Sequence, residues 1–94
     1  MKHPLRESAR GQGCTVHLTA CNRNPETVVL AHAPSLDKGW AVKGPDWWAA
    51  YACSSCHDLL DGRAPWEECC TKIEAWWWAV YRTQKIMHQE GLLT

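Results

Sequence analysis

Apolar and polar residues in the first third of the chain predict two short strands separated by a turn. Residues 14–18 alternate in the manner of a strand, and the β-branched run in residues 26–32 is the strongest strand signal in the sequence. Residues 21–25 between them are dense in turn formers. The pattern predicts a short antiparallel pair joined through the turn at Asn24 and Pro25.

The middle of the chain predicts a connector followed by a short helix. Residues 34–45 contain two prolines, Gly39 and Gly44, a composition that favours a loop. Residues 46–52 fit a short extended stretch or a turn of helix equally well, because their periodicity decides neither. Residues 54–61 predict a helix that ends at Gly62, since glycine suits a C-terminal cap.

The last third of the chain predicts a long helix, from Pro65 to about Glu90. One face of this helix is marked by Ile73, Trp77, Val80, Gln84 and Met87, with Trp76 and Tyr81 widening it. Three successive tryptophans, at 76–78, span about 200° of a helix and cannot all be buried against one partner. At least one of them is expected to be exposed or in an interface, and a homodimer through this helix is a hypothesis.

Length and charge indicate one domain with no overall basic character. The chain has 94 residues, with ten basic and ten acidic side chains. Residues 1–45 carry six basic and three acidic side chains, so the N-terminal half is the more positive. Residues 1–7 are expected to be flexible. No stretch is apolar and long enough for a signal peptide or a membrane span, so we expect a cytoplasmic protein with no membrane partner.

The six cysteines predict metal binding, since disulfides are rare in a reducing compartment. Cys53 and Cys56 have the spacing of a metal knuckle, whereas Cys14 and Cys21 have six residues between them and need a turn to meet. These four are predicted to hold structural zinc; the alternative is that they are buried as small apolar residues. The adjacent residues 69 and 70 diverge by about 100° in a helix and are interpreted as packing residues.

A second cluster of polar residues predicts reactive chemistry. His57 and Asp61 are four residues apart and share one face of the predicted helix, which favours a second metal site. His32 closes the second strand; on spacing alone such a histidine is more commonly a hydrogen-bonded structural residue. The same reading applies to His17 and His88.

The order of these parts resembles the zinc-containing branch of the HNH (ββα-metal) endonucleases. It comprises a cysteine pair, a strand ending in histidine, a loop and a Cys-x-x-Cys-His motif. More narrowly, the chain is similar to small prophage-encoded nucleases of the YbcO type in Ser8-Ala9-Arg10-Gly11, Cys14, Cys21-Asn22, Asn24-Pro25-Glu26-Thr27, Leu30-Ala31-His32, Pro45-Asp46, Ala52-Cys53-Ser54, Cys56-His57-Asp58 and Asp61.

This resemblance implies an α+β fold, a small zinc-stabilised ββα-metal (HNH-like) domain with a long C-terminal helix. The metal core would cover residues 8–63 and the helix residues 65–90. The resemblance also implies that His32 is the general base and that His57 holds a catalytic Mg²⁺ or Mn²⁺ ion, with Asp61 as a further ligand.

Two positions depart from the HNH pattern. Ala31 stands where many members have a metal ligand, and Trp48 stands where the middle asparagine would orient the base. Asp46 is the nearest polar substitute, so we expect it either to orient His32 or to supply the missing ligand. The other explanation is a loss of catalysis.

The sequence therefore predicts a metal-dependent endonuclease that hydrolyses phosphodiester bonds in DNA. Phosphate contacts are expected from Arg10, Arg23, Lys38, Lys43 and Arg63, or these are ordinary solvated charges. The alternative function is a catalytically inactive, zinc-stabilised module that binds nucleic acid or protein.

Overall fold

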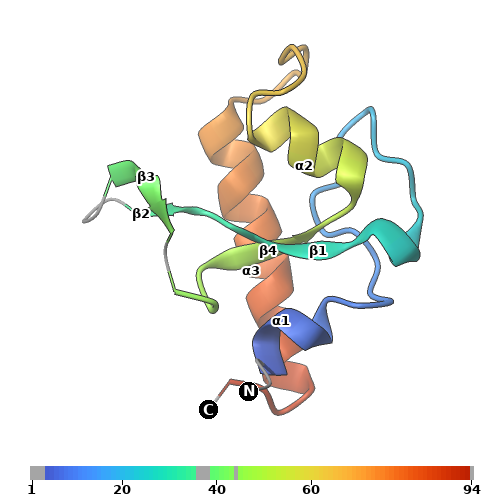
Figure 1. The fold of residues 1–94 in the computed structure, drawn as a ribbon, viewed down its shortest axis with the longest axis vertical. Coiled ribbons are helices and arrows are strands. Elements are labelled where there is room, and N and C mark those ends of the chain that lie inside the picture. Colours follow the sequence, from blue (N-terminus) through green and yellow to red (C-terminus); the bar gives the residue numbers. More distant parts are fainter. Residues whose placement is uncertain (1–3, 36–38, 44, 94) are drawn as a thin grey trace.

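A computed structural model describes residues 4–35, 39–43 and 45–93 of the chain. The elements labelled in Figure 1 are α1 (Pro4–Ser8), β1 (Val29–His32), β2 (Pro34–Ser35), β3 (Gly39–Lys43), β4 (Ala49–Ala52), α2 (Ser54–Leu60) and α3 (Lys72–Gln89). A short 3-10 helix, η1 (Pro25–Thr27), precedes β1. The fold is therefore α+β, with small antiparallel sheets and one long C-terminal helix. None of the described helices has the length and apolar character that a membrane span requires.

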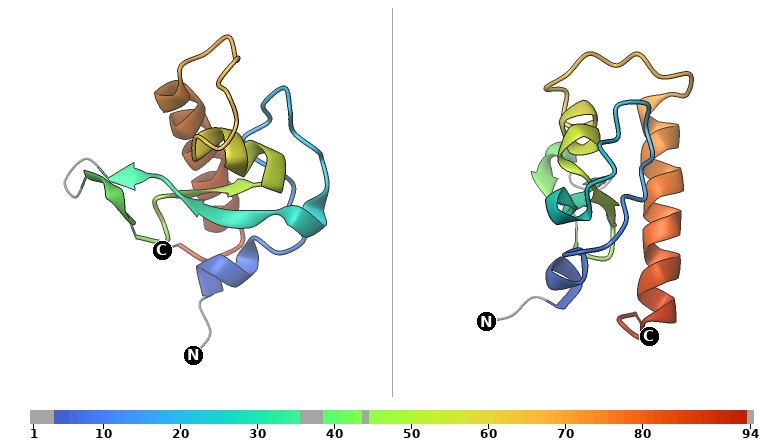
Figure 2. Two further views of the ribbon diagram at one scale, coloured as in Figure 1. Left: turned by 45° about the horizontal axis from the view of Figure 1, so that its top comes forward. Right: turned by 90° about the vertical axis from the view of Figure 1, so that its right-hand side faces the viewer.

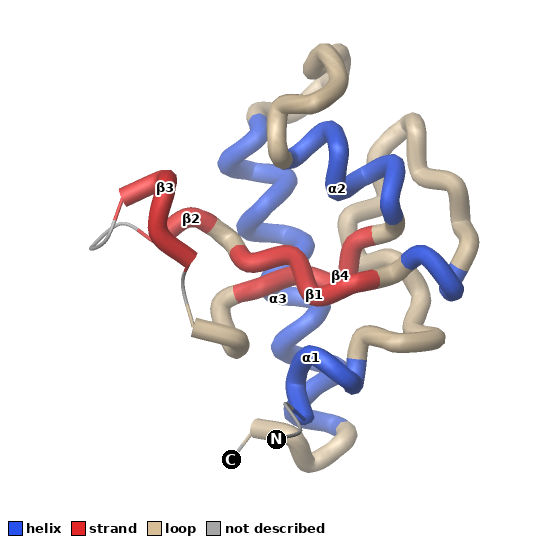
Figure 3. The backbone as a smooth tube through the Cα atoms, in the orientation of Figure 1, coloured by secondary structure: helices blue, strands red, loops and turns tan. Residues whose placement is uncertain are grey.

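The helix α3 forms a layer of its own. Figure 2 (right) shows α1, α2 and the strands lying together on one side of it, and Figure 3 shows how much of the remaining chain is loop. Small side chains line the junction: Ala50 and Ala52 of β4 and Ala75 and Ala79 of α3 are all buried in the same core cluster. Because alanine projects little beyond the backbone, a helix can lie close against a short sheet.

The pairing of β1 differs from the predicted hairpin. β1 runs antiparallel to β4, with His32 opposite Ala49. Residues 14–18 form no strand, because His17 adopts a left-handed φ of 54° that interrupts an extended run. The segment is nevertheless held inside the molecule, where the Thr15 amide donates to the Tyr51 carbonyl at 2.7 Å.

Between β1 and α2 the structure contains strands that the sequence pattern did not specify. Within residues 34–45, predicted to be a loop, β2 and β3 form a small antiparallel pair. Residues 46–52, for which helix and strand were both open, contain β4. The expected helix after the cysteine knuckle is present as α2, and Gly62 follows it with a positive φ of 82°.

The long helix begins later than predicted. It starts at Lys72, where Thr71 and Glu74 form a reciprocal capping box, and not at Pro65. Cys69 and Cys70 consequently precede the helix. The indole of Trp66 donates to the Cys70 carbonyl at 2.9 Å, which supports a non-helical turn here.

The tryptophan triplet divides between the core and the surface. Trp76 is 5% exposed, whereas Trp77 and Trp78 are 63% and 59% exposed, which confirms that the three could not share one buried face. The buried stripe of α3 is formed by Ala75, Trp76, Ala79, Val80, Thr83 and Met87. The predicted stripe was therefore partly wrong, since Ile73 is exposed together with Trp77 and Tyr81.

The N-terminal stretch is also more ordered than the expected flexible segment. Residues 4–8 form α1, whose Leu5 packs against the core. The Ser8 hydroxyl lies 2.7 Å from the hydroxyl of Tyr51, and Arg6 pairs with Asp46. These contacts with distant residues give a five-residue helix a stability that its own sequence does not supply.

Candidate functional site

The structure brings together the four cysteines that form two distant pairs in the sequence. Their sulfur atoms all lie within 4.8 Å of one another, and the Sγ atoms of Cys21 and Cys53 are 3.7 Å apart. Cys53 caps the N-terminus of α2, and Cys56 lies in its first turn. Cys14 and Cys21 flank an irregular stretch in which the Cys21 amide donates to the Leu18 carbonyl at 2.9 Å. This turn closes the long spacing between the first two cysteines.

The cluster has the dimensions of a tetrahedral thiolate site. Zinc–sulfur bonds of about 2.3 Å place neighbouring sulfurs about 3.8 Å apart in a tetrahedron. Cys14, Cys53 and Cys56 are buried and Cys21 is half-buried, so the site is closed to solvent on most sides. The four side chains can therefore hold a metal ion of the structural type.

Hydrogen bonds in the cluster already favour a thiolate at one cysteine. The bond from Cys56 and the surrounding backbone groups lowers the pKa of Cys14 to about 4, against burial, which acts in the opposite direction. The same bond raises the pKa of Cys56, and burial raises the pKa of Cys21. Ionising the whole cluster therefore requires a bound cation, as metal coordination supplies.

A shell of polar contacts fixes the loop that carries Cys21. The Asn22 side-chain amide donates to the Ser54 hydroxyl at 2.9 Å, and the Ser54 amide donates to the Thr27 hydroxyl at 3.2 Å. These bonds connect the loop to the first turn of α2. They hold the loop that carries Cys21 next to the start of α2 without any contribution from the sulfur atoms.

A second cluster joins His32 to Asp46. The two residues lie 14 positions apart in the sequence, and Nε2 of His32 is 2.7 Å from Oδ1 of Asp46. Their side chains are 12% and 26% exposed. The hydrogen bond to His32, helped by Arg6, lowers the pKa of Asp46, so Asp46 is a carboxylate at neutral pH. Because an anionic Asp46 can only accept a hydrogen bond, Nε2 is the nitrogen that carries the hydrogen in the neutral form of His32, and Nδ1 is then the basic nitrogen.

Arg6 is a member of this cluster that sequence reasoning missed. Its Nε lies 3.3 Å from the same Asp46 oxygen. It was overlooked because it falls in residues 1–7, which read as a flexible tail. A single arginine in a polar stretch carries no signal of a distant partner.

His57 and Asp61 form a pair along α2. Their Nε2 and Oδ2 atoms are 3.1 Å apart, as the four-residue spacing predicts, and both side chains are about one-third exposed, at 30% and 34%. Figure 1 shows α2 turning back beside the β1–β4 ribbon. In the described part of the chain, no hydrogen bond or ion pair links these two residues to His32 or Asp46. The four cysteines are also the one group there with three or more metal donors in reach of each other.

The basic residues proposed to contact phosphate are placed unevenly. Arg10 and Arg23 are exposed. Arg63 is exposed too, but lies 3.6 Å from Asp58 and 3.8 Å from Asp61. Lys38 and the side chain of Lys43 lie outside the described residues.

Comparison with known proteins finds relatives over almost the whole chain. The family model described as "Putative nuclease YbcO" matches residues 3–92. Two curated proteins, "Putative nuclease YbcO" of Escherichia coli (strain K12) and "Putative nuclease ybcO" of Enterobacteria phage 82, are each 41% identical over 91 residues, which covers 95% of this chain and 95% of theirs.

A solved structure shares the fold. It is described as "Structure of a putative bacteriophage protein from Escherichia coli str. K-12 substr. MG1655" and matches with a TM-score of 0.75 at 39% identity. The match covers 94% of this chain and all (100%) of the solved one. With its clustered cysteines and its matches over nearly its full length, the chain belongs to the YbcO family.

Proposed function

We propose that this protein is a metal-dependent endonuclease of the HNH type that hydrolyses phosphodiester bonds in DNA. Relatives that are 41% identical carry a nuclease name. The observation that carries the proposal is the bond of 2.7 Å between His32 and Asp46, which equips a histidine at the end of a strand to act as a general base.

His32 is the proposed base and Asp46 the residue that positions it. Asp46 accepts a hydrogen bond from Nε2–H of His32, so that Nδ1 of His32 is available to take a proton from a water molecule. The water oxygen then forms a bond to phosphorus, and the bond from phosphorus to the leaving oxygen breaks. Asp46 thereby performs the task that the absent asparagine would perform, and the first of the two roles considered for it is favoured.

His57 and Asp61 are the proposed holders of the catalytic ion. The Asp61 carboxylate suits a Mg²⁺ or Mn²⁺ ion that keeps water and substrate phosphate among its other ligands, and the His57 imidazole is the proposed nitrogen ligand beside it. Such an ion supplies charge neutralisation at the phosphate and at the leaving oxygen. Both side chains are partly exposed, so a phosphate group can approach them.

The structural ion is proposed to be zinc, held by the four cysteines. Its role is to fix the start of α2, and so the position of His57 and Asp61 in the following turns. The basic residues Arg10, Arg23 and Arg63 are proposed to contact DNA phosphates, together with Arg6 next to Asp46.

A plasmid-nicking assay with Mg²⁺ or Mn²⁺ tests the proposal. His32→Ala is expected to lower the nicking rate by about 10²–10⁴-fold, the usual contribution of a general base. His88→Ala is the matched control, because the side chain of His88 is exposed on α3 and belongs to neither cluster, and it should leave the rate unchanged. Equal rates for wild type and His32→Ala would eliminate His32 as the base.

The rival is a zinc-stabilised binding module without turnover. It is favoured by Ala31, which cannot ligate a metal, and by the absence of a third donor beside His57 and Asp61 in the described residues. Wild-type protein that binds DNA in a salt-sensitive way but never nicks it, with either ion, would establish this rival.

A further inference from the structure

The outward face of α3 carries an unusual concentration of exposed aromatic side chains. This outer face, as we call it, consists of Glu74, Trp77, Trp78, Tyr81, Lys85 and His88. Successive members are mostly three or four residues apart, so they form one stripe along the helix. Trp77, Trp78 and Tyr81 are each about 60% exposed, at 63%, 59% and 59%. The stripe lies opposite the buried face that packs against β4.

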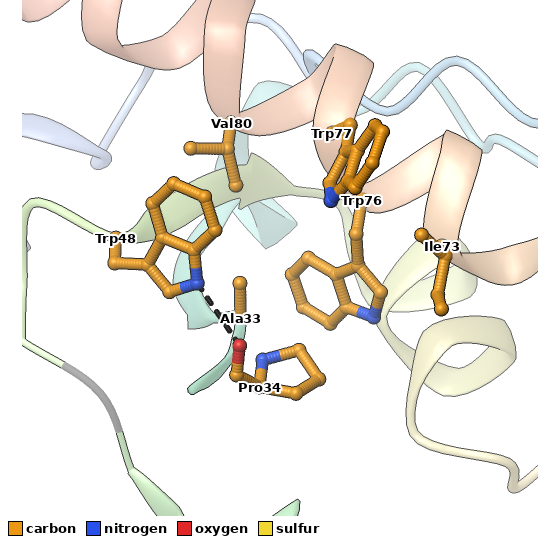
Figure 4. A pocket seen from close by; sticks show the side chains of 7 residues that line it. All are labelled: Ala33, Pro34, Trp48, Ile73, Trp76, Trp77 and Val80. Atoms are coloured by element: carbon orange, nitrogen blue, oxygen red, sulfur yellow. Dashed lines mark hydrogen bonds between the residues drawn. The ribbon is translucent and has the colours of Figure 1, made fainter. Parts of the chain in front are cut away.

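An apolar pocket extends this surface at one edge. Its lining includes Trp48, Trp76 and Val80 together with the exposed side chains of Ile73 and Trp77, and its volume is about 80 Å³ (Figure 4). Trp48 is fixed there because its indole donates to the Pro34 carbonyl at 3.0 Å. The pocket is large enough for a few methyl or methylene groups of an apolar side chain.

The exposed area is larger than isolated surface residues would give. An aromatic side chain buries about 150–250 Å² when fully covered, so the three exposed aromatic residues present roughly 300–450 Å². A standard interface covers about 800 Å² on each partner. The aromatic residues can therefore form the centre of such an interface, with Ile73 and the charged members of the outer face around them.

Charges at the two ends of the outer face identify the partner. Glu74 lies in the first turn of α3, and Lys85 and His88 lie in its last two turns. No described residue forms an ion pair with Glu74 or Lys85. A surface with acid at one end, bases at the other and aromatic residues between them is complementary to itself when reversed. We propose that the outer face of α3 binds a second copy of this chain, with the two helices antiparallel.

The register of this pair follows from the sequence. A twofold axis midway between Trp78 and Tyr81 places Trp78 of one copy beside Tyr81 of the other, and Glu74 level with Lys85. Tyr81, Gln84, Lys85, His88 and Gln89 line a shallow groove of about 410 Å³, which receives the first turn of the other helix. A parallel arrangement would instead set Glu74 against Glu74 and Lys85 against Lys85.

Single-stranded nucleic acid is the competing occupant, because bases stack on exposed aromatic rings. Glu74 disfavours it, since a strand that follows the whole stripe would bring its phosphates near this carboxylate. The position of the stripe also separates it from the proposed catalytic residues. β1 and α2, which carry His32 and His57, lie together with α1 on the other side of α3 (Figure 2), so dimerisation leaves them accessible.

Sedimentation equilibrium of the full, metal-loaded chain without nucleic acid tests the proposal over concentrations from about 1 µM to about 1 mM. The wild type is expected to be a dimer in the upper part of this range. Trp78→Ala should weaken the dimer at least about a hundredfold, because a central aromatic residue is lost from both copies. Alanine preserves helix propensity, and unchanged far-ultraviolet circular dichroism shows that the variant folds.

Charge variants test the orientation of the helices. Lys85→Glu should weaken the dimer about tenfold, because it turns two attractive pairs into two repulsive ones. Adding Glu74→Gln to that variant should recover part of the loss, since glutamine removes the repulsion and still completes the capping box. Glu26→Lys is the control for the reversal of an exposed charge outside α3 and should have no effect.

Three results would overturn the proposal. A wild-type chain that stays monomeric up to the highest concentration has no self-complementary face. A dimer that is insensitive to both Trp78→Ala and Lys85→Glu uses another surface. A monomer whose tryptophan fluorescence is quenched by a single-stranded oligonucleotide, with the quenching lost in Trp78→Ala, assigns the face to nucleic acid. None of these measurements depends on nuclease activity, so they fail or succeed independently of the proposed function.

Discussion

Removal of the metal ion from the four-cysteine cluster is expected to unfold the protein. Residues 13–22 contain no helix or strand, yet they contribute Cys14 and Cys21 to the cluster and several residues to the core. The ion would join this irregular segment to the start of α2, where Cys53 is the N-cap and Cys56 lies in the first turn. Without it, the segment keeps only its hydrogen bonds and a limited apolar area.

The expected magnitude follows from two known ranges. Structural zinc contributes about 10–16 kcal/mol of apparent binding free energy at pH 7 in small zinc domains. A whole domain has a free energy of unfolding of only about 5–15 kcal/mol. The loss of the ion therefore matches or exceeds the entire stability. Cys53→Ser should have a similar effect, because it removes a ligand and leaves a hydroxyl in a fully buried position.

The assay combines metal content with a fold measurement. The purified chain should contain one zinc ion per molecule, and a strong chelator should abolish its near-ultraviolet circular dichroism, which reports on packed tryptophans. Adding zinc back should restore the signal. Cys69→Ser is the matched control, because Cys69 is a free, exposed cysteine outside the cluster.

The reasoning would be refuted by a chain that is metal-free and yet melts at the same temperature as the untreated protein. It would also be refuted if Cys69→Ser were as damaging as Cys53→Ser. In the first case the four thiols would be packing residues. In the second, the effect would come from the loss of any thiol and not from the cluster.

Two further substitutions test a buried hydrogen bond and a partly exposed charged cluster. Thr83→Val should lower the free energy of unfolding by about 1–3 kcal/mol in chemical denaturation, because the amide of Tyr51 loses its acceptor, the Thr83 hydroxyl at 3.0 Å; Thr83→Ser, which keeps the hydroxyl, should cost less. Asp46→Asn tests the charged cluster. The hydrogen bond to His32 and then Arg6 lower the pKa of the Asp46 carboxyl group in the folded protein. The carboxylate therefore stabilises the fold above the ordinary pKa of 3.8, and this stabilisation is lost as the pH falls below that value. The stability difference between wild type and Asp46→Asn should therefore shrink as the pH falls below that value, and a difference that widens there would contradict the assigned sign.

Local signals in the sequence predicted the elements whose ends are fixed by neighbouring residues. The helix α2 follows from Cys53 at its N-cap and Gly62 after its end, where the φ of 82° favours glycine. The start of α3 was misplaced because Pro65 with two following glutamates imitates a helix start. The better signal was Thr71 with Glu74 three residues later, a capping box that is readable from the sequence.

Pairing between distant segments was the part that the sequence could not predict. β4 is Ala49–Ala52, in which Tyr51 alone favours a strand and the three alanines do not, so strand propensity gave little reason to choose it as the partner of β1. Its strand conformation comes from burial between β1 and α3. In the same way, no local rule could have joined Arg6 to Asp46, which lie 40 residues apart in the sequence.

The contacts among the four cysteines and between His32 and Asp46 were easier to predict than the pairing of the strands, and there is a physical reason for this. A metal cluster needs particular atoms in particular numbers, so Cys53 and Cys56 limit the choice of partners to the few other cysteines. A strand needs only a backbone, which every segment has. The pair of His32 and Asp46 follows the same logic, because the strand-ending histidine needed an acceptor and Asp46 was the nearest polar side chain to the position of the missing asparagine. The chemical requirements of the thiols and of the histidine therefore determined which residues are in contact. The small side chains of β4 allowed α3 to pack close to the sheet and complete the fold around these contacts.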